Sequence, residues 1–437
     1  WRSPVTIPDV SPVDVQYAET YRFLCSLDRF GILLGLDNIR SLLAQLGDPQ
    51  MTFPSVHITG SKGKGSTAAM TAGILRKAGH KVALYTSPHL NDFRERIRLN
   101  GAMVSKDAVI ASTEKIRKVY DPERTTFFEF TTAVAFDCIR EWGPDIAVIE
   151  VGLGGRLDAT NTVRSIVTVI TEISLEHEDY LGRGIASIAG EKAGIIKPGV
   201  PLITGATRKE AKEVILGTAE NLGSRAWQFG RDFVGVRTGS DHFTYKSGSM
   251  TLEGLRSGMA GAHQMKNASL SCAVVETLRS LGYGISEAAI REGLETTVFP
   301  GRFEVLRRNP DVVIDGAHTP DSMRLLKSTT SKLYPGVKPF VLLGMLAEKD
   351  YHQMSAIMAP IAREVVCVAP QGDRSLDAES LASAVGRHGV PVRAAAGIEE
   401  GFAMLMERAG FNDLILATGS LYMIGPVRRA CGIADDA

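Results

Sequence analysis

The sequence predicts a parallel α/β protein with more than one domain. Apolar runs typical of strands alternate with helix-like segments along most of the chain, which is the pattern of parallel sheets covered by helices. These runs are almost continuously apolar, as expected for strands buried on both faces. A length of 437 residues exceeds one ordinary hydrophobic core and favours two or three domains.

The first half of the chain is expected to form the larger sheet. Between about Trp227 and Thr251 the sequence changes to short polar alternations, which predict antiparallel hairpins appended to that sheet. The predicted strands of the sheet itself are Val56–Gly60, Val82–Thr86, Ile146–Val151, Ile166–Ile173 and Val200–Thr204.

A candidate linker separates this half from the next. Pro300 and Gly301 follow a helical run, and this pair is typical of a connection between domains. We therefore expect one domain at residues 1–298 and a second α/β domain at residues 299–437. The predicted strands of the second domain are Val312–Ile314, Phe340–Leu343, Val365–Val368, Val392–Ala395 and Leu414–Ala417.

Composition argues against several classes of partner. Lys+Arg and Asp+Glu balance at 49 each, so no overall charge favours nucleic acid or an acidic membrane. The five cysteines are scattered and never spaced as Cys-x-x-Cys, which fits a reducing cytoplasm. No apolar run approaches the roughly 20 residues that span a bilayer. The sequence starts at Trp1 rather than Met, so a removed leader is an open alternative.

The stretch "GSKGKGST" lies between a predicted strand and a predicted helix at Thr67–Ala78, the context that a P-loop requires. Glycines allow successive backbone amides to converge on phosphate oxygens at the helix N-terminus. Lys64 would neutralise the β- and γ-phosphates, and the hydroxyl of Ser66 would ligate Mg²⁺. The alternative is a flexible Gly/Ser turn, since an extra glycine separates the lysine from the hydroxyl. The candidate nucleotide-binding residues are Gly60, Gly63, Lys64, Gly65, Ser66 and Thr67.

An acidic residue ends another predicted strand. Glu150 follows the buried run Ile146–Ile149, and a carboxylate at the end of a strand beside a P-loop suits a nucleotide-bound metal ion. Without the P-loop, a solvated strand end would be an equal alternative. The glycines that follow are no dinucleotide fingerprint, because Leu157 stands in place of the third glycine. No hydride transfer is therefore expected.

Together these motifs resemble those of the folylpolyglutamate synthase/dihydrofolate synthase family, a branch of the Mur-type amide ligases. The resemblance runs from about Leu27 to Arg428. Lys62, Glu176 and Thr319 depart from the family pattern, which has Asn, Asp and Asn at these places. The motifs follow in the order "LDRFGILLGLDNIRSLL", "GSKGKGST", "YTSPHLNDFRERIRLNG", "FFEFTTAVAF", "EVGLGGRLDATN", "EHEDYLGRGIASIAGEKAGIIKPG", "GAHQMKNA", "PGRFEVL", "DGAHTPDS", "GMLAEKD" and "TGSLYMIGPVR".

The resemblance implies a fold and a reaction. The fold would be a P-loop Mur-ligase-type central domain with a small appended antiparallel β region, followed by a C-terminal Rossmann-like α/β domain. ATP would phosphorylate the carboxylate of a folate or dihydropteroate, and the amine of L-glutamate would attack the acyl phosphate. Two Mg²⁺ ions would neutralise charge in a cleft between the domains, and the family implies a monomer.

The resemblance also implies roles for residues of the first domain. Ser87, Glu150 and His177 would join Ser66 as metal ligands, although Ser87 could instead cap a helix and His177 could lie on the surface. Asn267, which opens a predicted helix, would contact the adenine side of ATP. Lys192 would be carbamylated, so that a cation becomes an anionic metal ligand; its alternative is a helix-surface position.

In the second domain, Arg302 and Asp315 would contact the nucleotide, and His318 would face the γ-phosphate or the glutamate. The alternatives are a linker ion pair for Arg302 and a strand-end cap for Asp315. Glu129, an acid in an apolar segment, is either structural or faces the folate.

Two other functions compete. A Mur-type ligase with a non-folate acceptor would be expected to carry a UDP-sugar-binding domain, but only about 55 residues precede the P-loop. A regulatory P-loop ATPase needs no second α/β domain carrying "DGAHTP".

Overall fold

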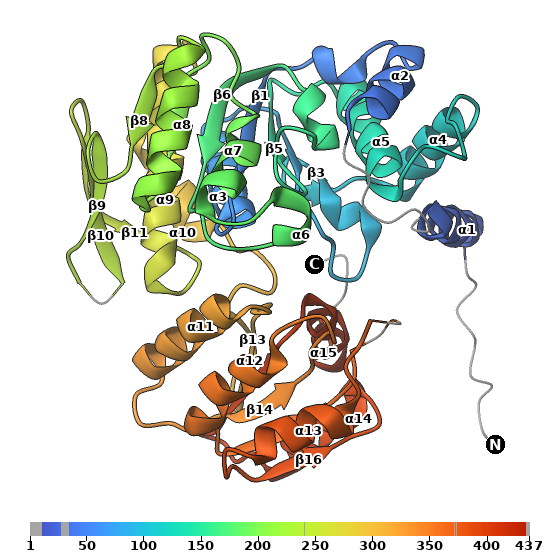
Figure 1. The fold of residues 1–437 in the computed structure, drawn as a ribbon, viewed down its shortest axis with the longest axis vertical. Helices are drawn as coiled ribbons and strands as arrows, with labels where there is room; N and C mark the ends of the chain where they lie inside the picture. Colours follow the sequence, from blue (N-terminus) through green and yellow to red (C-terminus); the bar gives the residue numbers. More distant parts are fainter. Residues whose placement is uncertain (1–10, 28–34, 240, 371, 373, 434–437) are drawn as a thin grey trace, which may run out of the picture. The chain divides into compact units, whose positions relative to one another are not determined.

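The computed structural model describes residues 11–27, 35–239, 241–370, 372 and 374–433. The chain divides into two compact units (Figure 1). Unit 1 comprises Trp1–His89, Phe93–Ser257 and Met265–Thr297; unit 2 comprises Leu90–Asp92, Gly258–Gln264 and Val298–Ala437. Residues 28–34, part of the motif that begins at Leu27, lie outside the described residues. None of the described helices is long and apolar enough to cross a membrane.

Unit 1 is built on a mixed sheet with the strand order β4-β3-β2-β5-β1-β6-β7-β8. The six strands from β2 to β8 pair in parallel, whereas β3 and β4 add antiparallel to β2 at one edge. The strands are β1 (Ser55–Thr59), β2 (Val82–Tyr85), β3 (Ile97–Leu99), β4 (Ala102–Met103), β5 (Ile146–Glu150), β6 (Ser165–Ile170), β7 (Leu202–Thr204) and β8 (Ala226–Gln228). The five predicted strands are therefore present, shifted by a few residues at their ends, and the β3–β4 hairpin was not predicted.

Helices cover both faces of this sheet. On one face α2 (Asp37–Gln45), α4 (Lys106–Arg117) and α5 (Phe127–Trp142) bury one apolar cluster with β2 and β5, next to α1 (Pro12–Ser26). On the same face α7 (Ile185–Ala193) and α8 (Lys209–Asn221) form a second cluster over β6 and β7. The opposite face carries α3 (Lys64–Lys77), which packs on α10 (Glu287–Thr296) and contacts β1, β2 and β5.

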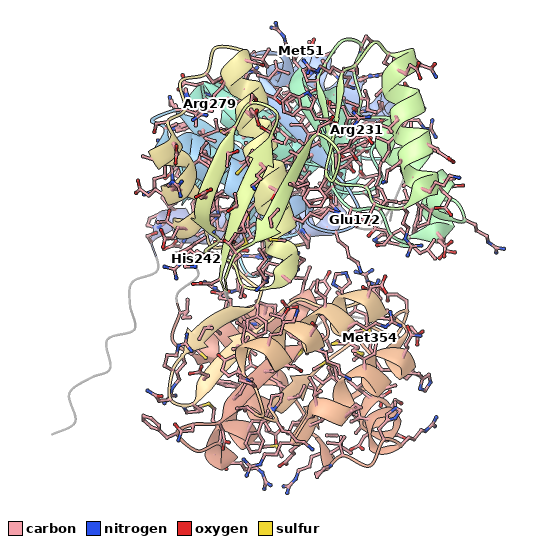
Figure 2. The ribbon with its side chains drawn as sticks, turned by 90° about the vertical axis from the view of Figure 1, so that its left-hand side faces the viewer. Met51, Glu172, Arg231, His242, Arg279 and Met354 are labelled. Atoms are coloured by element: carbon pink, nitrogen blue, oxygen red, sulfur yellow. The ribbon has the colours of Figure 1, made fainter. Side chains whose placement is uncertain are left out.

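The predicted antiparallel region is a separate sheet rather than an extension of the main one. Its order is β11-β10-β9, with β9 at Phe233–Arg237, β10 at His242–Ser247 and β11 at Thr251–Arg256. It packs on α9 (Ala262–Ser280), where Gly235 leaves room for Ser269 and the Tyr245 hydroxyl donates to Glu276 at 2.8 Å. Figure 2 shows these strands with His242 at one end, and with Arg279 of α9 toward the other. Only β8, at the start of the predicted region, joins the main sheet.

Unit 2 is a doubly wound α/β unit. Its sheet has the order β12-β13-β17-β14-β15-β16, parallel except for the edge strand β12. Two apolar clusters cover its faces, one with α11 (Pro320–Leu333), α12 (Tyr351–Met358) and α13 (Ala378–Gly386), the other with α14 (Ile398–Arg408) and α15 (Ile424–Ala430). This confirms the Rossmann-like prediction. The strands are β12 (Glu304–Arg307), β13 (Asp311–Ile314), β14 (Phe340–Leu343), β15 (Glu364–Cys367), β16 (Val392–Ala394) and β17 (Leu414–Thr418).

Candidate functional site

The glycine loop of unit 1 connects β1 to α3 and has a backbone that only glycine tolerates well. Gly60 and Gly63 have φ values of +148° and +89°. A Cβ on Gly60 would overlap the hydroxyl of Thr171, and one on Gly63 would overlap the side-chain oxygen of Asn267. α3 begins at Lys64, three residues earlier than predicted. The N-cap residue of α3 is Gly63, which has no side chain to cap the first amides of the helix. These amides therefore suit an anion.

The segment after β6 holds this loop in place. The amide of Ser61 donates to the carbonyl of Glu172 at 2.8 Å, and the Ser61 hydroxyl donates to the carbonyl of Ser174 at 2.9 Å. The Thr171 hydroxyl donates to the carbonyl of Lys62 at 2.7 Å. Three contacts from one neighbouring segment give the loop a defined shape, which a flexible Gly/Ser turn would lack.

Two lysines converge on this loop. Lys64 donates to the carbonyl of Gly60 at 2.9 Å, and Lys192 of α7 donates to the same oxygen at 3.0 Å. Lys192 is 1% exposed and forms an ion pair with Glu176 at 2.9 Å. The alternative of a helix-surface position for Lys192 is therefore wrong.

Electrostatics at Lys192 favour a reactive amine. Burial lowers the pKa of Lys192 to about 8; Lys64 adds to this decrease, and Glu176 opposes it. Burial alone would raise the pKa of Glu176, but the charges of Lys64 and Lys192 outweigh it and hold this pKa below its ordinary value. The neutral amine of Lys192 is therefore more accessible than that of an exposed lysine.

Ser87 and Glu150 are brought together at the same edge of the sheet. β2, β5, β1 and β6 are neighbours and parallel, so the segments that follow them meet at their carboxyl ends. Glu150, the last residue of β5, is buried, and its Oε2 accepts the amide of Ser87 at 3.2 Å. The next helical turn begins at Phe93, so the alternative that Ser87 caps a helix is wrong.

His177 follows β6 and is exposed at the N-cap of the short helix α6 (Glu178–Leu181). Its φ of +48° is unusual for a residue with a side chain. Among the described residues, no three His, Cys, Asp or Glu side chains gather in a cluster suited to a metal ion. The donor set at this edge, one buried carboxylate with the serine hydroxyls, still fits Mg²⁺, because this ion retains several waters and takes phosphate oxygens as ligands.

Asn267 contacts the glycine loop. The prediction that it opens a helix was wrong. α9 begins at Ala262, so Asn267 lies in the second turn, with its amide against Gly63. The preceding residue, Lys266, forms an ion pair with Glu172, which also accepts the hydroxyl of Thr207 at 3.0 Å. Glu172 thus joins α9 to the segment that holds the loop. This role of Glu172 was not predicted, because Glu172 lay inside the predicted strand Ile166–Ile173, whereas β6 ends at Ile170.

In unit 2, Asp315 follows β13 and shapes a turn. Its two carboxylate oxygens accept the amides of Phe303 and Ala317, both at 2.9 Å. Burial raises the pKa of Asp315, and the charge of Arg302 opposes this. The bonds agree with a strand-end cap, whereas contact of either residue with the nucleotide stays a prediction.

Next to this turn, His318 Nδ1 lies 2.7 Å from the carbonyl oxygen of Gly316. Thr319 caps α11 and exchanges hydrogen bonds with Ser322, so the departure from Asn keeps a capping residue at this helix start. A role of His318 at the γ-phosphate or the glutamate stays a prediction.

Glu129 is accounted for within unit 1. Its carboxylate accepts both the amide and the hydroxyl of Thr126 at 2.9 Å, while the Glu129 amide donates to the Thr126 hydroxyl at 3.2 Å. This is a capping box at the start of α5. Glu129 therefore has a structural role.

Comparisons with known proteins agree with this geometry. Residues 58–275 match the Mur ligase middle domain, and residues 301–421 match the Mur ligase glutamate ligase domain. The chain is 32% identical to the dihydrofolate synthase/folylpolyglutamate synthase of Bacillus subtilis, over 92% of this chain and 96% of that protein. It is 35% identical, over 95% of its length, to a probable bifunctional folylpolyglutamate synthase/dihydropteroate synthase of Haloferax volcanii, of which it spans about half.

Solved structures match as well. One is the bifunctional folylpolyglutamate synthase/dihydrofolate synthase with Mn, AMPPNP and L-glutamate bound, which shares the fold with a TM-score of 0.83 and 30% identity. The match covers 94% of this chain and 98% of that one. A second, a Yersinia pestis synthase complexed with AMPPNP and a Mn ion, has a TM-score of 0.84 and 29% identity, and the match covers 99% of this chain and all of that one.

Proposed function

Because this chain belongs to the folylpolyglutamate synthase/dihydrofolate synthase family of Mur ligases, we propose that it joins L-glutamate to a folate or dihydropteroate carboxylate, with conversion of ATP to ADP and phosphate. The observation that carries this proposal is the convergence of Lys64 and Lys192 on Gly60, within a rigid glycine loop and on the same sheet edge as Glu150. Such a loop suits a triphosphate. The matching second unit and the relatives' names favour a glutamate ligase over a regulatory ATPase.

In the proposed reaction, an acceptor carboxylate oxygen attacks the γ-phosphorus of ATP. The bond between this phosphorus and the β–γ bridging oxygen breaks, and ADP leaves. The glutamate amine then attacks the acyl carbon, loses a proton and expels phosphate. The phosphates would be held by amides of the glycine loop and of the α3 N-terminus, together with Ser66 and Thr67. The ammonium of Lys64 would offset their charge. Asn267, Arg302 and Asp315 are proposed nucleotide contacts, and His318 a catalytic contact.

Ser66, Ser87, Glu150 and His177 are the residues proposed to hold Mg²⁺. When bound, two such ions would supply the charge neutralisation that lets one anion attack another. Ser87 and Glu150 already contact each other, which supports them most directly.

Lys192 is proposed to react with CO₂. Its neutral amine would add to the carbon of CO₂ and release one proton, which leaves a carbamate anion. Burial and the pKa of about 8 support this step. Glu176 opposes formation of the carbamate. Its carboxylate lies 2.9 Å from the Lys192 ammonium and would repel a carbamate anion at the same place. A cation between the two anions would remove this repulsion, so we expect the carbamate to form together with metal binding.

The acceptor and the cellular context are also proposals. We infer a cytoplasmic monomer that acts on small molecules and binds neither nucleic acid nor membrane. The balanced charge and the five free cysteines are consistent with this. Light scattering after size exclusion would test the monomer.

An ADP-release assay with dihydropteroate and tetrahydrofolate in parallel tests the function. We expect release that requires both L-glutamate and at least one of these acceptors. Release without an acceptor would indicate an ATPase, and no release with either acceptor would contradict a folate ligase.

A further inference from the structure

A buried histidine lies in the strand that leads to the glycine loop. His57 is the third residue of β1 and is fully buried; it pairs in register with Ile149 of β5 and Thr168 of β6. Its Nε2 lies 2.9 Å from the hydroxyl oxygen of Thr160. The ring therefore bridges from β1 to the chain that follows β5.

Thr160 continues this bridge to a buried carboxylate. Its hydroxyl donates to Oδ1 of Asp158, and its amide donates to the same oxygen at 3.0 Å. The other oxygen of Asp158 accepts the amide of Leu153 at 2.8 Å. Asp158 thus fixes the loop of residues 151–158, here called the Glu150 loop, which follows directly after Glu150.

The direction of these hydrogen bonds sets the tautomer of His57. Thr160 has a single hydroxyl proton and donates it to the carboxylate, so Nε2 of His57 must carry the hydrogen and donate to Thr160. Nδ1 has no hydrogen-bond partner among the described residues and then bears only a lone pair. Burial lowers the pKa of His57 to about 3, which agrees with a neutral ring.

A second set of contacts joins β1 to the same loop. The hydroxyl of Thr59 donates to the carbonyl of Gly154 at 2.7 Å, and the amide of Val151 donates to the carbonyl of Ile58 at 2.9 Å. The strand that carries the glycine loop and the residues that follow Glu150 are therefore joined at several points.

We propose that His57 and Thr160 are positioning residues for Glu150, acting through Asp158 and the Glu150 loop. This rests on the proposed role of Glu150 as a metal ligand. A ligand carboxylate needs neighbours that fix its orientation, and loss of such neighbours typically weakens metal binding by about 10- to 100-fold. A purely structural pair would stabilise the fold without a selective effect on metal binding.

Matched variants separate these roles. Thr160→Val removes one hydroxyl at almost constant shape. Thr168→Val is its control, since the buried Thr168 hydroxyl has no hydrogen-bond partner in the described structure. His57→Gln keeps a nitrogen donor at the same number of bonds from Cβ as Nε2, whereas His57→Met has similar length and no donor.

Two readouts are measured on each variant of this chain. The first is hydrogen exchange of the amides of residues 151–158. The second is binding of Mn²⁺ in the presence of AMPPNP, measured by electron paramagnetic resonance. We expect Thr160→Val and His57→Met to speed exchange in the loop and to weaken Mn²⁺ binding by up to roughly 10-fold, the lower end of the range for direct neighbours of a ligand, because they act on Glu150 through the loop. Thr168→Val should change neither, and His57→Gln should retain most of the wild-type behaviour.

Equal losses in Thr160→Val and Thr168→Val, or faster loop exchange with unchanged Mn²⁺ affinity, would overturn the proposal. Neither readout depends on turnover. If the wild-type protein ligates no glutamate, the proposed function fails, while the exchange and Mn²⁺ results still decide the role of His57 and Thr160.

Discussion

Two loops with the same topology differ in their chemistry. Each follows a parallel strand and enters a helix: the glycine loop joins β1 to α3, and residues 315–319 join β13 to α11. In the first, the N-cap is Gly63, and two lysines share one carbonyl. In the second, Thr319 caps the helix, and Asp315 accepts two backbone amides.

This difference indicates different functions for the two loops. The glycine loop offers the ammonium of Lys64 and helix-start amides whose charge a polyanion would neutralise. In the loop of unit 2, Asp315 accepts the amides of Phe303 and Ala317, which fixes the turn beside Arg302. The same strand-to-helix topology therefore presents helix-start amides in unit 1 and a side-chain-capped helix start in unit 2.

The largest expected effect is on Lys64. Lys64→Ala should lower kcat by at least about 10²- to 10³-fold, because a cation that offsets developing phosphate charge is lost. Lys77→Ala, at the other end of α3, is the matched control and should keep wild-type turnover. Thermal unfolding without nucleotide should shift little in either variant. Near-normal ligation by Lys64→Ala would show that this loop is not the catalytic phosphate loop.

Lys192 should respond to pH and CO₂. The pKa of Lys192 is lowered to about 8 by burial, and bound Mg²⁺ would lower it further, so at constant dissolved CO₂ the carbamate should increase with pH at and below this value, with Mg²⁺ and ATP analogue present. A ¹³C carbamate signal from ¹³CO₂ measures it. Lys192→Arg keeps the charge and should show no signal and little activity. A fully active wild-type protein without this signal would exclude the modification.

Glycine substitutions test the shape of the glycine loop. Gly63 and Gly79 both have a φ of +89°, but a Cβ meets Asn267 only at Gly63. Alanine at either site should cost about 1–2 kcal/mol of unfolding free energy from backbone strain. Only Gly63→Ala should also weaken AMPPNP binding, and Asn267→Ala in the same chain should relieve the overlap. Equal nucleotide affinities of the two glycine variants would argue against a shape requirement.

Asp315→Asn tests the supporting role of the second loop. Asparagine replaces one of the two accepting oxygens by an NH₂ group. The amide of Phe303 or Ala317 then loses its partner, which should lower the free energy of unfolding by about 1–3 kcal/mol. Chemical denaturation of the full chain measures this cost. Unchanged stability with a raised KM for ATP would instead indicate direct nucleotide contact alone.

The smallest effect is expected at Glu129. Glu129→Ala should cost about 1 kcal/mol through loss of the capping box, while Glu129→Gln should retain much of it. The KM for the pteridine acceptor should be unchanged in both variants. A raised KM in Glu129→Gln would show that this carboxylate faces the acceptor.

Much of the fold follows from local patterns in the sequence. β1 and β5 were predicted because their runs are largely apolar, in β5 without interruption from Ile146 to Ile149. β12 was missed because it is a short edge strand directly after the Pro300-Gly301 pair. The capping box was readable as Thr-x-x-Glu at Thr126, whereas the interpretation of Glu129 relied on its apolar surroundings alone.

The site was less accessible to sequence patterns. Lys192 and Gly60 are 132 positions apart, so their contact depends on how α7 packs over the sheet. The bridge from His57 to Asp158 likewise depends on the order of β5 and β1 in the sheet. The residue type alone gives no sign of it, because a lone histidine in an apolar strand is usually part of the core.

The central claim is that the chain activates an acceptor carboxylate as an acyl phosphate. An acceptor labelled with ¹⁸O in that carboxylate, incubated with ATP, Mg²⁺ and L-glutamate, tests it directly by mass spectrometry of the released phosphate. Attack on the γ-phosphorus places one carboxylate oxygen in the phosphate, so we predict phosphate that carries a single ¹⁸O for each amide formed. Amide formation with unlabelled phosphate would contradict this account.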